Sequence, residues 1–401
     1  MLRQYFDLAM RTFKHKPTRS WLTIIGIFIG IAAVVALVSL GQGLQNAINQ
    51  QFDILGTNKI SIYAGKSSFG VLGAIGTSDR LNDRDISAIQ RVNGVEKAVG
   101  IMLTISEAKY KDKPYYFIIA GFDPNEINIY DFMGVQMTSG RELKSNDAYK
   151  VMVGYDFSTT EVFEKPIKVG DKLKINGKDF TVIGVVSKIG NPGFDRRIYI
   201  TKDTFMDVFK QEGYPLILTI AKENANVTEV AENIKERLRK ERDLEKGKET
   251  FTVMTSEQMR GVALRIIGLV QIIVIGIAAI SLIVGGIGIM NTMYTSVLER
   301  TREIGIMKAV GARNRDIMMI FLIESGILGL VGGVIGTVVG ITIAYLVEKI
   351  AITYNISIYI TFEPIIIVGA ILFSFIVGSL SGLLPALQAA KMKPAEILRY
   401  E

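Results

Sequence analysis

The chain has 401 residues, of which 49% are hydrophobic and 21% are charged, whereas soluble proteins usually carry about 25% charged residues. It contains no cysteine and one histidine, His15. This composition excludes a disulfide framework and leaves no Cys or His outside the membrane for a zinc site or a nucleophile–histidine pair. The formal net charge is +7, and its placement beside apolar segments indicates membrane topology rather than a nucleic-acid surface.

Four apolar segments are each long enough to cross a bilayer, which requires about 20 mostly apolar residues. We expect transmembrane helices at residues 21–43, 261–297, 317–347 and 364–390. Basic residues gather before the first segment, between the second and third, and after the fourth, whereas the loop between the third and fourth carries only Lys349. Because short cytoplasmic loops are enriched in Lys and Arg, we predict a multi-pass protein of the cell membrane with both termini in the cytoplasm.

The connecting parts follow from this topology. They are a cytoplasmic amphipathic helix at 1–20, an extracytoplasmic α+β domain with helical stalk ends at 44–260, a cytoplasmic segment at 298–316, a short outer loop at 348–363 and a cytoplasmic tail at 391–401. The fold class is therefore a polytopic α-helical membrane protein with four transmembrane helices and a large domain between helices 1 and 2. The N-terminal segment could equally be a basic flank with no further role.

Two of the predicted helices extend beyond the bilayer. Residues 41–52 keep apolar Leu44, Ile48 and Phe52 at helical spacing after the first span. Residues 266–298 contain no charge, and at 1.5 Å per residue they form a helix of about 50 Å, against a hydrocarbon core of about 30 Å. Two such helices leaving the membrane together would make a stiff connection to the outer domain.

The outer domain shows many short β-rich runs and a few helical patterns, which is typical of an α+β fold of one or two subdomains. The expected strands lie at 59–63, 95–105, 115–120, 150–153, 172–175, 180–186, 197–200, 216–220 and 251–254, and the expected helices at 83–92, 201–209 and 227–240. Asn176-Gly177 predicts a type I′ hairpin turn. The Gly-rich stretch 65–76 is interpreted as a mobile loop.

Polar motifs in this domain do not indicate catalysis. Asp79, Asp83 and Asp85 could hold a hard cation, but Asn82 before Asp83 favours the capped start of a helix. Gly65-Lys66-Ser67 resembles the end of a phosphate-binding loop, yet Ile60 stands where that motif requires glycine. We therefore expect no catalytic residue, no metal and no cofactor in this chain.

Within the spans, Glu324 is an acid about two turns into the third. Such a residue suggests proton coupling, although its shallow position favours a snorkelling or pairing role. Glycines also recur at spacing four, which allows close helix approach and self-association. These helix-packing residues are Gly26, Gly30, Gly332, Gly336 and Gly340.

The charged segment 297–313 lies between two apolar runs and must face an aqueous side. On a helix, Glu299 pairs with Arg302 and Arg300 with Glu303 at i,i+3. An apolar edge is expected from residues 304, 307 and 310, and a stop from Gly311. Composition alone leaves open whether this helix docks a partner or only links two spans.

This segment resembles the signature of the MacB/FtsX-like ABC-transporter permeases, and Pro385-Ala386, Ala389-Ala390 and Pro394 to Arg399 resemble their C-terminal ending. Gly140-Arg141 and residues 180–185 resemble their periplasmic core domain. The resemblance implies a coupling helix that docks on an ATPase through Glu299, Arg300, Arg302, Glu303, Ile304, Gly305, Met307, Lys308, Gly311 and Ala312. Lys308 stands where relatives usually have arginine, which exchanges a planar fork for a point charge.

The chain begins at the amphipathic helix, so the resemblance implies a separate ABC ATPase subunit that uses ATP and Mg. The expected function is a permease subunit that transmits ATP-driven motion to the outer domain for export or extraction of an amphipathic substrate. It would form a homodimer in membrane lipid, with a possible extracytoplasmic adaptor and no nucleic-acid partner. A regulatory or sensor complex using the same lever is the alternative, and an enzyme is the third reading.

Overall fold

The computed structural model describes residues 17–66, 70–111, 113–128, 131, 133–160, 162–353 and 360–393, with side chains from residue 24 onwards. The predicted amphipathic helix at 1–20 and the tail beyond residue 393 lie largely outside the described residues. The chain divides into two compact units. A helical unit comprises Met1–Gln45, Ile266–Ile350 and Ile358–Glu401, and an α+β unit comprises Asn46–Arg265 and Ala351–Ser357.

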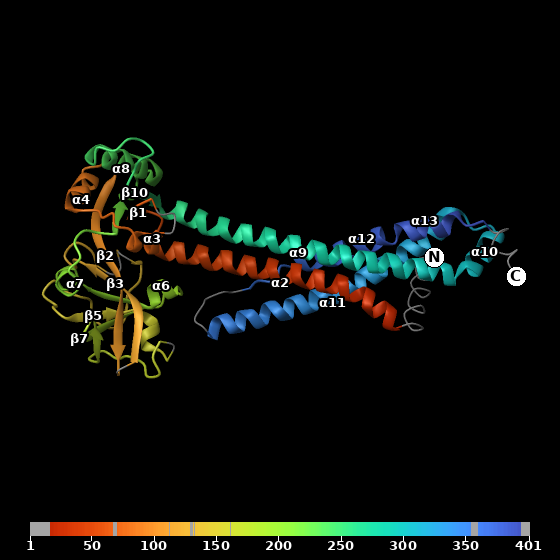
Figure 1. Cartoon of the computed structure of the whole chain (residues 1–401), viewed down its shortest axis with the longest axis horizontal. Helices are drawn as coiled ribbons and strands as arrows, with labels where there is room; N and C mark the ends of the chain where they lie inside the picture. The colour runs from red at the N-terminus through yellow and green to blue at the C-terminus, as the bar shows by residue number, and fades with distance from the viewer. Residues whose placement is uncertain are drawn as a thin grey trace. The chain divides into compact units, whose positions relative to one another are not determined.

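The helical unit is built from long apolar helices and two short ones (Figure 1). Its elements are α2 (Pro17–Leu55), α9 (Ser256–Glu299), α10 (Thr301–Ala309), α11 (Asn314–Thr353), α12 (Pro364–Ser381) and α13 (Leu383–Lys391). Among the described residues, α2, α9, α11 and α12 are long and apolar enough to cross a membrane. The fourth predicted span, 364–390, is interrupted at Gly382, where α12 ends and α13 begins.

Small residues bring α2 into close contact with both α9 and α11. A Cβ atom on Gly26 would lie 2.5 Å from the Gly285 Cα, and one on Gly336 would lie 2.7 Å from the Phe28 carbonyl oxygen. Larger side chains cannot occupy these positions without separating the helices. All five predicted helix-packing glycines are used in this way inside one protomer, at Gly26, Gly30, Gly332, Gly336 and Gly340. The self-association that this spacing also allows stays a prediction.

The first lobe of the α+β unit is a ferredoxin-like split βαβ fold. Its elements are β1 (Lys59–Ala64), α4 (Asp83–Gln90), β2 (Val95–Tyr110), β9 (Leu216–Ala221), α8 (Val227–Glu241) and β10 (Phe251–Thr255). The strands follow the order β10-β1-β9-β2 with antiparallel pairing throughout. This is the sheet order expected when two βαβ units interleave.

The second lobe is inserted between β2 and β9 and closes into a barrel. It contains β3 (Lys113–Phe122), β4 (Met137–Gly140), β5 (Lys150–Val153), β6 (Lys172–Ile175), β7 (Lys178–Val186) and β8 (Arg197–Thr201). The pairs run β2-β3-β8-β5-β7, and β6 pairs with both β7 and β2. This closes a ring of strands, and an aromatic cluster of Phe117, Phe157 and Phe163 packs with it. We call this part the barrel lobe.

The helices around this barrel are short. They are η1 (Tyr155–Ser158), α6 (Pro192–Asp195) and α7 (Lys202–Phe209). All nine strands and three helices predicted for the outer domain are present. Among the described residues, the sequence analysis missed strand β4 and the short helices α3, η1 and α6. Asn176 and Gly177 have φ values of +46° and +79° and join β6 to β7, which confirms the type I′ turn.

The second part of the Gly-rich stretch, residues 70–76, contradicts the interpretation of this stretch as a mobile loop. Residues 70–76 form helix α3 (Gly70–Gly76), and its Ala74 is fully buried. Val71 and Ile75 pack on the same apolar cluster, which contains Tyr63 and Leu103. Helical spacing of three apolar residues therefore outweighs the low helix propensity of the glycines here.

The aspartates of α4 serve capping and pairing, as the sequence favoured. The Asn82 side chain accepts hydrogen bonds from the backbone N–H groups of Arg84 and Asp85, and Asp85 accepts one from the Asn82 N–H in return. The buried Asp85 carboxylate also receives the Arg242 guanidinium at 2.9 and 2.7 Å. This bond to Asp85 raises the pKa of Arg242. The described residues contain no cluster of three or more metal-ligating side chains.

Substitution of Arg242 tests this buried pair. Arg242→Ala leaves the Asp85 carboxylate buried without its cation, so we expect the free energy of unfolding to fall by about 3 kcal/mol. The matched control is Arg237→Ala on the same helix, because Arg237 makes an exposed ion pair at 3.8 Å with Glu241 and should cost under about 1 kcal/mol. Pulse proteolysis of the purified chain in urea measures both. Equal losses in the two variants would contradict this account.

Candidate functional site

The charged segment between α9 and α11 folds as a turn followed by the short helix α10. Arg300 is the residue at which α9 ends and α10 begins, since its N–H donates to the Ser296 carbonyl at 3.1 Å and its carbonyl accepts from the Ile304 N–H at 3.0 Å. The Thr301 hydroxyl donates to the Val297 and Leu298 carbonyls at 3.1 and 2.7 Å. The chain thus changes direction without leaving these backbone groups unpaired.

The Arg300 guanidinium ties α10 to α11. Its Nη1 donates to Glu324 Oε2 at 3.0 Å, and its Nε donates to Glu303 Oε2 at 3.0 Å. The guanidinium also lies 5.4 Å from the ring centroid of the fully buried Phe321. Glu324 is only 7% exposed, so the ion pair is shielded from water. The predicted Arg300–Glu303 pair and the pairing role of Glu324 are confirmed. The sequence analysis did not predict that Arg300 binds both acids.

The inward face of α10 packs into the core of the helical unit. Ile304 is fully buried beside Val297, Ile317 and Phe321. Gly305 is buried, and Met307 packs against the same cluster. Of the expected apolar edge at positions 304, 307 and 310, the first two side chains pack into the helical core, whereas Val310 is exposed.

Lys308 caps the helix α13. Its ammonium donates to the carbonyl oxygens of Ala390 and Met392 at 2.5 and 2.6 Å. These carbonyls belong to the end of α13, where backbone acceptors have no intrahelical donor and a cation is favoured by the helix dipole. Lys308 was expected at the docking surface, but its ammonium is directed towards the protein's own C-terminal helix.

Gly311 ends α10 as the sequence predicted. Its φ is +106°, its N–H donates to the Lys308 carbonyl at 3.1 Å, and the Ala312 N–H donates to the Met307 carbonyl at 3.0 Å. These two bonds define a Schellman motif, which needs a residue without Cβ strain at the left-handed position. Ala312 then packs against the helical core.

The outward face of α10 combines charge with exposed apolar side chains. Ile306 is 50% exposed and Val310 is 84% exposed. Arg302 is also exposed and lies one turn before Ile306 on the same face. Glu299 and Glu303 are exposed as well, and Leu298 adds a further exposed apolar group. We call Leu298, Glu299, Arg302, Glu303, Ile306 and Val310 the outward face.

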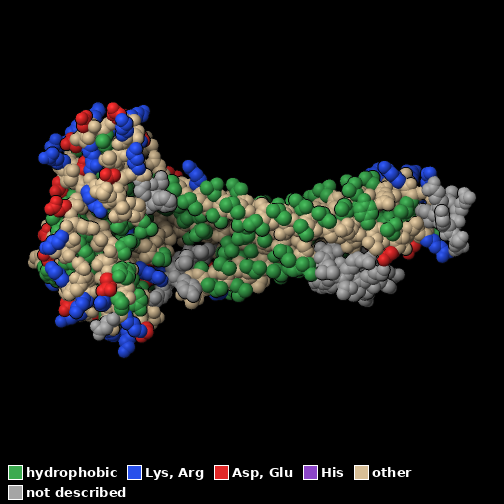
Figure 2. All heavy atoms as spheres, viewed as in Figure 1, with side chains coloured by type: hydrophobic (Ala, Val, Ile, Leu, Met, Phe, Trp, Pro, Cys, Tyr) green, Lys and Arg blue, Asp and Glu red, His purple; other side chains and the backbone are tan. Residues whose placement is uncertain are grey.

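The surface of the helical unit sets this face apart from its surroundings. Figure 2 shows hydrophobic side chains along the visible sides of the long helices, and Lys, Arg, Asp and Glu side chains gathered at the end that carries α10 and α13. Apolar groups facing lipid need no partner, whereas exposed apolar groups among charges mark interaction sites. The outward face therefore mixes charged and exposed apolar side chains, whereas the visible sides of the long helices are mainly apolar.

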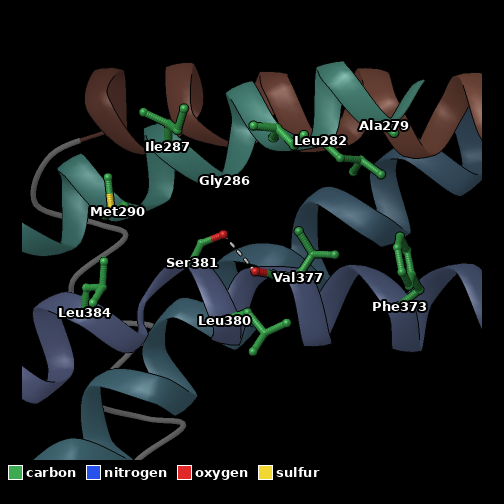
Figure 3. Close-up of a pocket in the computed structure, with 11 residues that line it drawn as sticks. Ala279, Leu282, Gly286, Ile287, Met290, Phe373, Val377, Leu380, Ser381 and Leu384 are labelled. Atoms are coloured by element: carbon green, nitrogen blue, oxygen red, sulfur yellow. Dashed lines mark hydrogen bonds between the residues drawn. The ribbon is translucent and has the colours of Figure 1, made fainter. Parts of the chain in front are cut away.

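A second candidate site lies between α9 and α12 (Figure 3). This cavity of about 490 Å³ is lined mainly by apolar side chains, among them Leu282, Ile287, Phe373 and Leu380. The hydroxyl of Ser381 donates to the Val377 carbonyl at 2.8 Å and so is already satisfied. The described lining contains no titratable group, so the cavity suits an apolar occupant.

A third candidate lies in the α+β unit, where a polar cavity of about 460 Å³ is lined by Asp83, Lys202 and Tyr214 among others. The Tyr214 hydroxyl donates to Asp83 Oδ1 at 2.7 Å, and Lys202 Nζ lies 3.9 Å from the same oxygen. The pKa of the Tyr214 hydroxyl is raised, mainly because the side chain is partly buried. These groups satisfy one another, and the cavity has no histidine or cysteine to form an activated nucleophile.

Comparison with known proteins decides the family. The MacB-like periplasmic core domain matches residues 20–237, and the FtsX-like permease C-terminal domain matches residues 275–394. The chain belongs to the MacB/FtsX-like ABC transporter permeases. It is a membrane protein of this family.

Three relatives match this chain over nearly its full length. An uncharacterized ABC transporter permease of Methanocaldococcus jannaschii is 40% identical over 98% of this chain and 97% of its own length. The uncharacterized ABC transporter permease YknZ of Bacillus subtilis is 30% identical over all of both chains. The macrolide export ATP-binding/permease protein MacB of Bdellovibrio bacteriovorus is 30% identical over 99% of this chain but only 62% of its own.

The role of the buried Glu324 can be measured directly. In Glu324→Ala the Arg300 guanidinium loses its buried partner, which costs about 3 kcal/mol and should accelerate amide hydrogen exchange in residues 301–309 roughly 100-fold. Glu303→Ala is the matched control, since it removes the exposed acid from the same guanidinium. We expect less than a tenfold change there. Faster exchange in the control than in Glu324→Ala would refute the assignment.

Proposed function

We propose that this chain is the permease subunit of an ABC transporter and receives movement from a separate ATPase subunit at the outward face of α10. The observation that carries the proposal is the pair of exposed apolar side chains, Ile306 and Val310, on a helix whose other face is fixed by Arg300 and Lys308. A docking helix must transmit force rather than yield to it. The buried ion pair and the capped α13 supply that rigid backing.

Movement of α10 would pass to the α+β unit through α2 and α9. Both helices have residues in each compact unit, since the unit boundaries fall at residues 45/46 and 265/266. The glycine contacts place α2 directly against α9 and α11, so a shift that starts at α10 would reach α2 as well as α9. We propose that this lever extracts or exports an amphipathic substrate. Glu324, the acid within the third span, is paired with Arg300 and so does not mark a polar pathway. This supports a route in which the substrate does not pass between the helices.

The proposed assembly is a homodimer in the cell membrane, with four spans and both termini in the cytoplasm. ATP and Mg would be bound by the ATPase subunit, and an extracytoplasmic adaptor could join the α+β unit. The match over 97% and 100% of two relatives that are named ABC transporter permeases supports an ATPase supplied by a partner.

Substitution on the outward face tests docking. Ile306→Asp places a charge where an apolar contact is needed, so we expect stimulation of the cognate ATPase by the permease in liposomes to fall at least tenfold with unchanged thermal stability. The matched control is Ile105→Asp in the α+β unit, where Ile105 is 49% exposed. Full stimulation with Ile306→Asp would contradict docking at α10. The buried Gly305 is a poor target, because a larger side chain there would disturb packing.

The absence of native cysteine makes the topology testable in cells. In the variant Val310→Cys, whose position is 84% exposed, the thiol should react with a membrane-impermeant maleimide only after the cells are permeabilised. A thiol at Tyr116, which is 72% exposed, should react in intact cells. Labelling of position 310 from outside would refute the topology.

A further inference from the structure

The end of α2 makes a side-chain contact with the barrel lobe, although in sequence it is followed by the first lobe. The chain leads from α2 through Gly56 directly into β1 of the first lobe. Near that end, Gln51 Nε2 donates to the Gly190 carbonyl at 3.0 Å. Its Oε1 accepts from Asn191 Nδ2 at 3.1 Å. Both partners lie between β7 and β8, in the barrel lobe, so one amide bridges α2 to a lobe that is distant in sequence.

The loop that receives Gln51 is held by hydrogen bonds to a buried carboxylate. The buried Asp195 carboxylate accepts from the backbone N–H groups of Ile189, Gly190 and Asn191 at 2.9, 2.7 and 2.9 Å. Next to it, Arg196 Nε donates to the buried Asp156 at 2.8 Å. Force applied at residues 190–191 would therefore move the barrel lobe rather than bend the loop.

A second contact lies beside the first. Gly134 has φ +73°, and a Cβ atom there would lie 2.0 Å from the Ile54 carbonyl oxygen. The backbone of the barrel lobe thus approaches the last turn of α2 as closely as glycine allows. Met133 and Val135 on either side are buried in the same apolar cluster as Ile189. The end of α2 is held at two places by the barrel lobe.

The start of α9 is tied to the first lobe instead. Helix α9 follows β10 without a linker, and Thr255 and Gln258 form a reciprocal capping box, with bonds of 3.0 and 3.1 Å. The Ser256 hydroxyl donates to the carbonyl of Lys59 in β1 at 3.3 Å. The hydrogen bonds from the end of α2 described above therefore reach the barrel lobe, whereas the one from Ser256 at the start of α9 reaches the first lobe.

We propose that Gln51 and Asn191 form an amide latch by which displacement of α2 relative to α9 turns the barrel lobe against the ferredoxin-like lobe. Gln51 is a positioning residue in this device. The inference rests on the proposed function, because it names the contact through which the lever reaches its load. The lobes share the long strand β2, which pairs with β9 up to Ile101 and with β3 from Met102 onwards. A change in the twist of β2 between these two stretches would accommodate the turn.

The test uses the full chain with its cognate ATPase in nanodiscs and spin labels at Lys172→Cys and Glu232→Cys, which are exposed positions in the two lobes. In the chain without further substitution, trapping with ATP and vanadate should change the distance between the labels. Gln51→Leu removes both hydrogen bonds at similar volume. Asn191→Asp keeps the oxygen that caps α6 through the Gly193 N–H but loses the donor to Gln51. Each should reduce the change by at least half while the rate of ATP hydrolysis stays the same.

Gln50→Leu is the matched control, because Gln50 is the exposed neighbour on the same helix. It should leave the distance change intact. A change that persists at full size in both Gln51→Leu and Asn191→Asp would overturn the latch and leave the proposed function standing. No nucleotide-dependent change even with the latch intact would overturn both.

Discussion

The charge of Arg300 determines which side of α10 meets the solvent. Its guanidinium is shared between the buried Glu324, the exposed Glu303 and the ring of Phe321. A charge at that depth is stable only when it is paired, so the position of α10 follows from where Glu324 sits on α11. Once this pair forms, Ile304 must face the core and Ile306 must face outwards. The surface available to a partner is thus a consequence of one internal ion pair.

Lys308 and the glycines extend the same logic to the rest of the helical unit. Lys308 joins α10 to α13 by capping its carbonyls, and close approach at Gly26 and Gly336 joins α2 to α9 and α11. Each contact uses a residue type that sequence reasoning had assigned to an external partner. In this helical unit, these charged and small residues make internal contacts. A partner can bind only the side chains that remain exposed.

The sequence predicted local structure well, because alternation, caps and turn residues act over a few positions. Asn176-Gly177 and the Asn82 cap are examples. It could not predict closure of the barrel, since the pairing of β6 with β2 joins Ala108 to Ile175 across a long separation. It missed β4, whose residues Met137 to Gly140 show no apolar alternation. The orientation of α10 could not be predicted either. Charges at i,i+3 are compatible with either face of the helix towards solvent, and the orientation depends on the bond from Arg300 to Glu324 in α11.

The most direct test of docking at the outward face is protection of a single thiol at position 306 in the otherwise cysteine-free chain. The rate of its reaction with a maleimide is measured in nanodiscs with and without the cognate ATPase, beside a thiol at position 105. The account predicts that the ATPase slows labelling at 306 at least tenfold and leaves 105 unchanged. Equal labelling rates at position 306 with and without bound ATPase would contradict it.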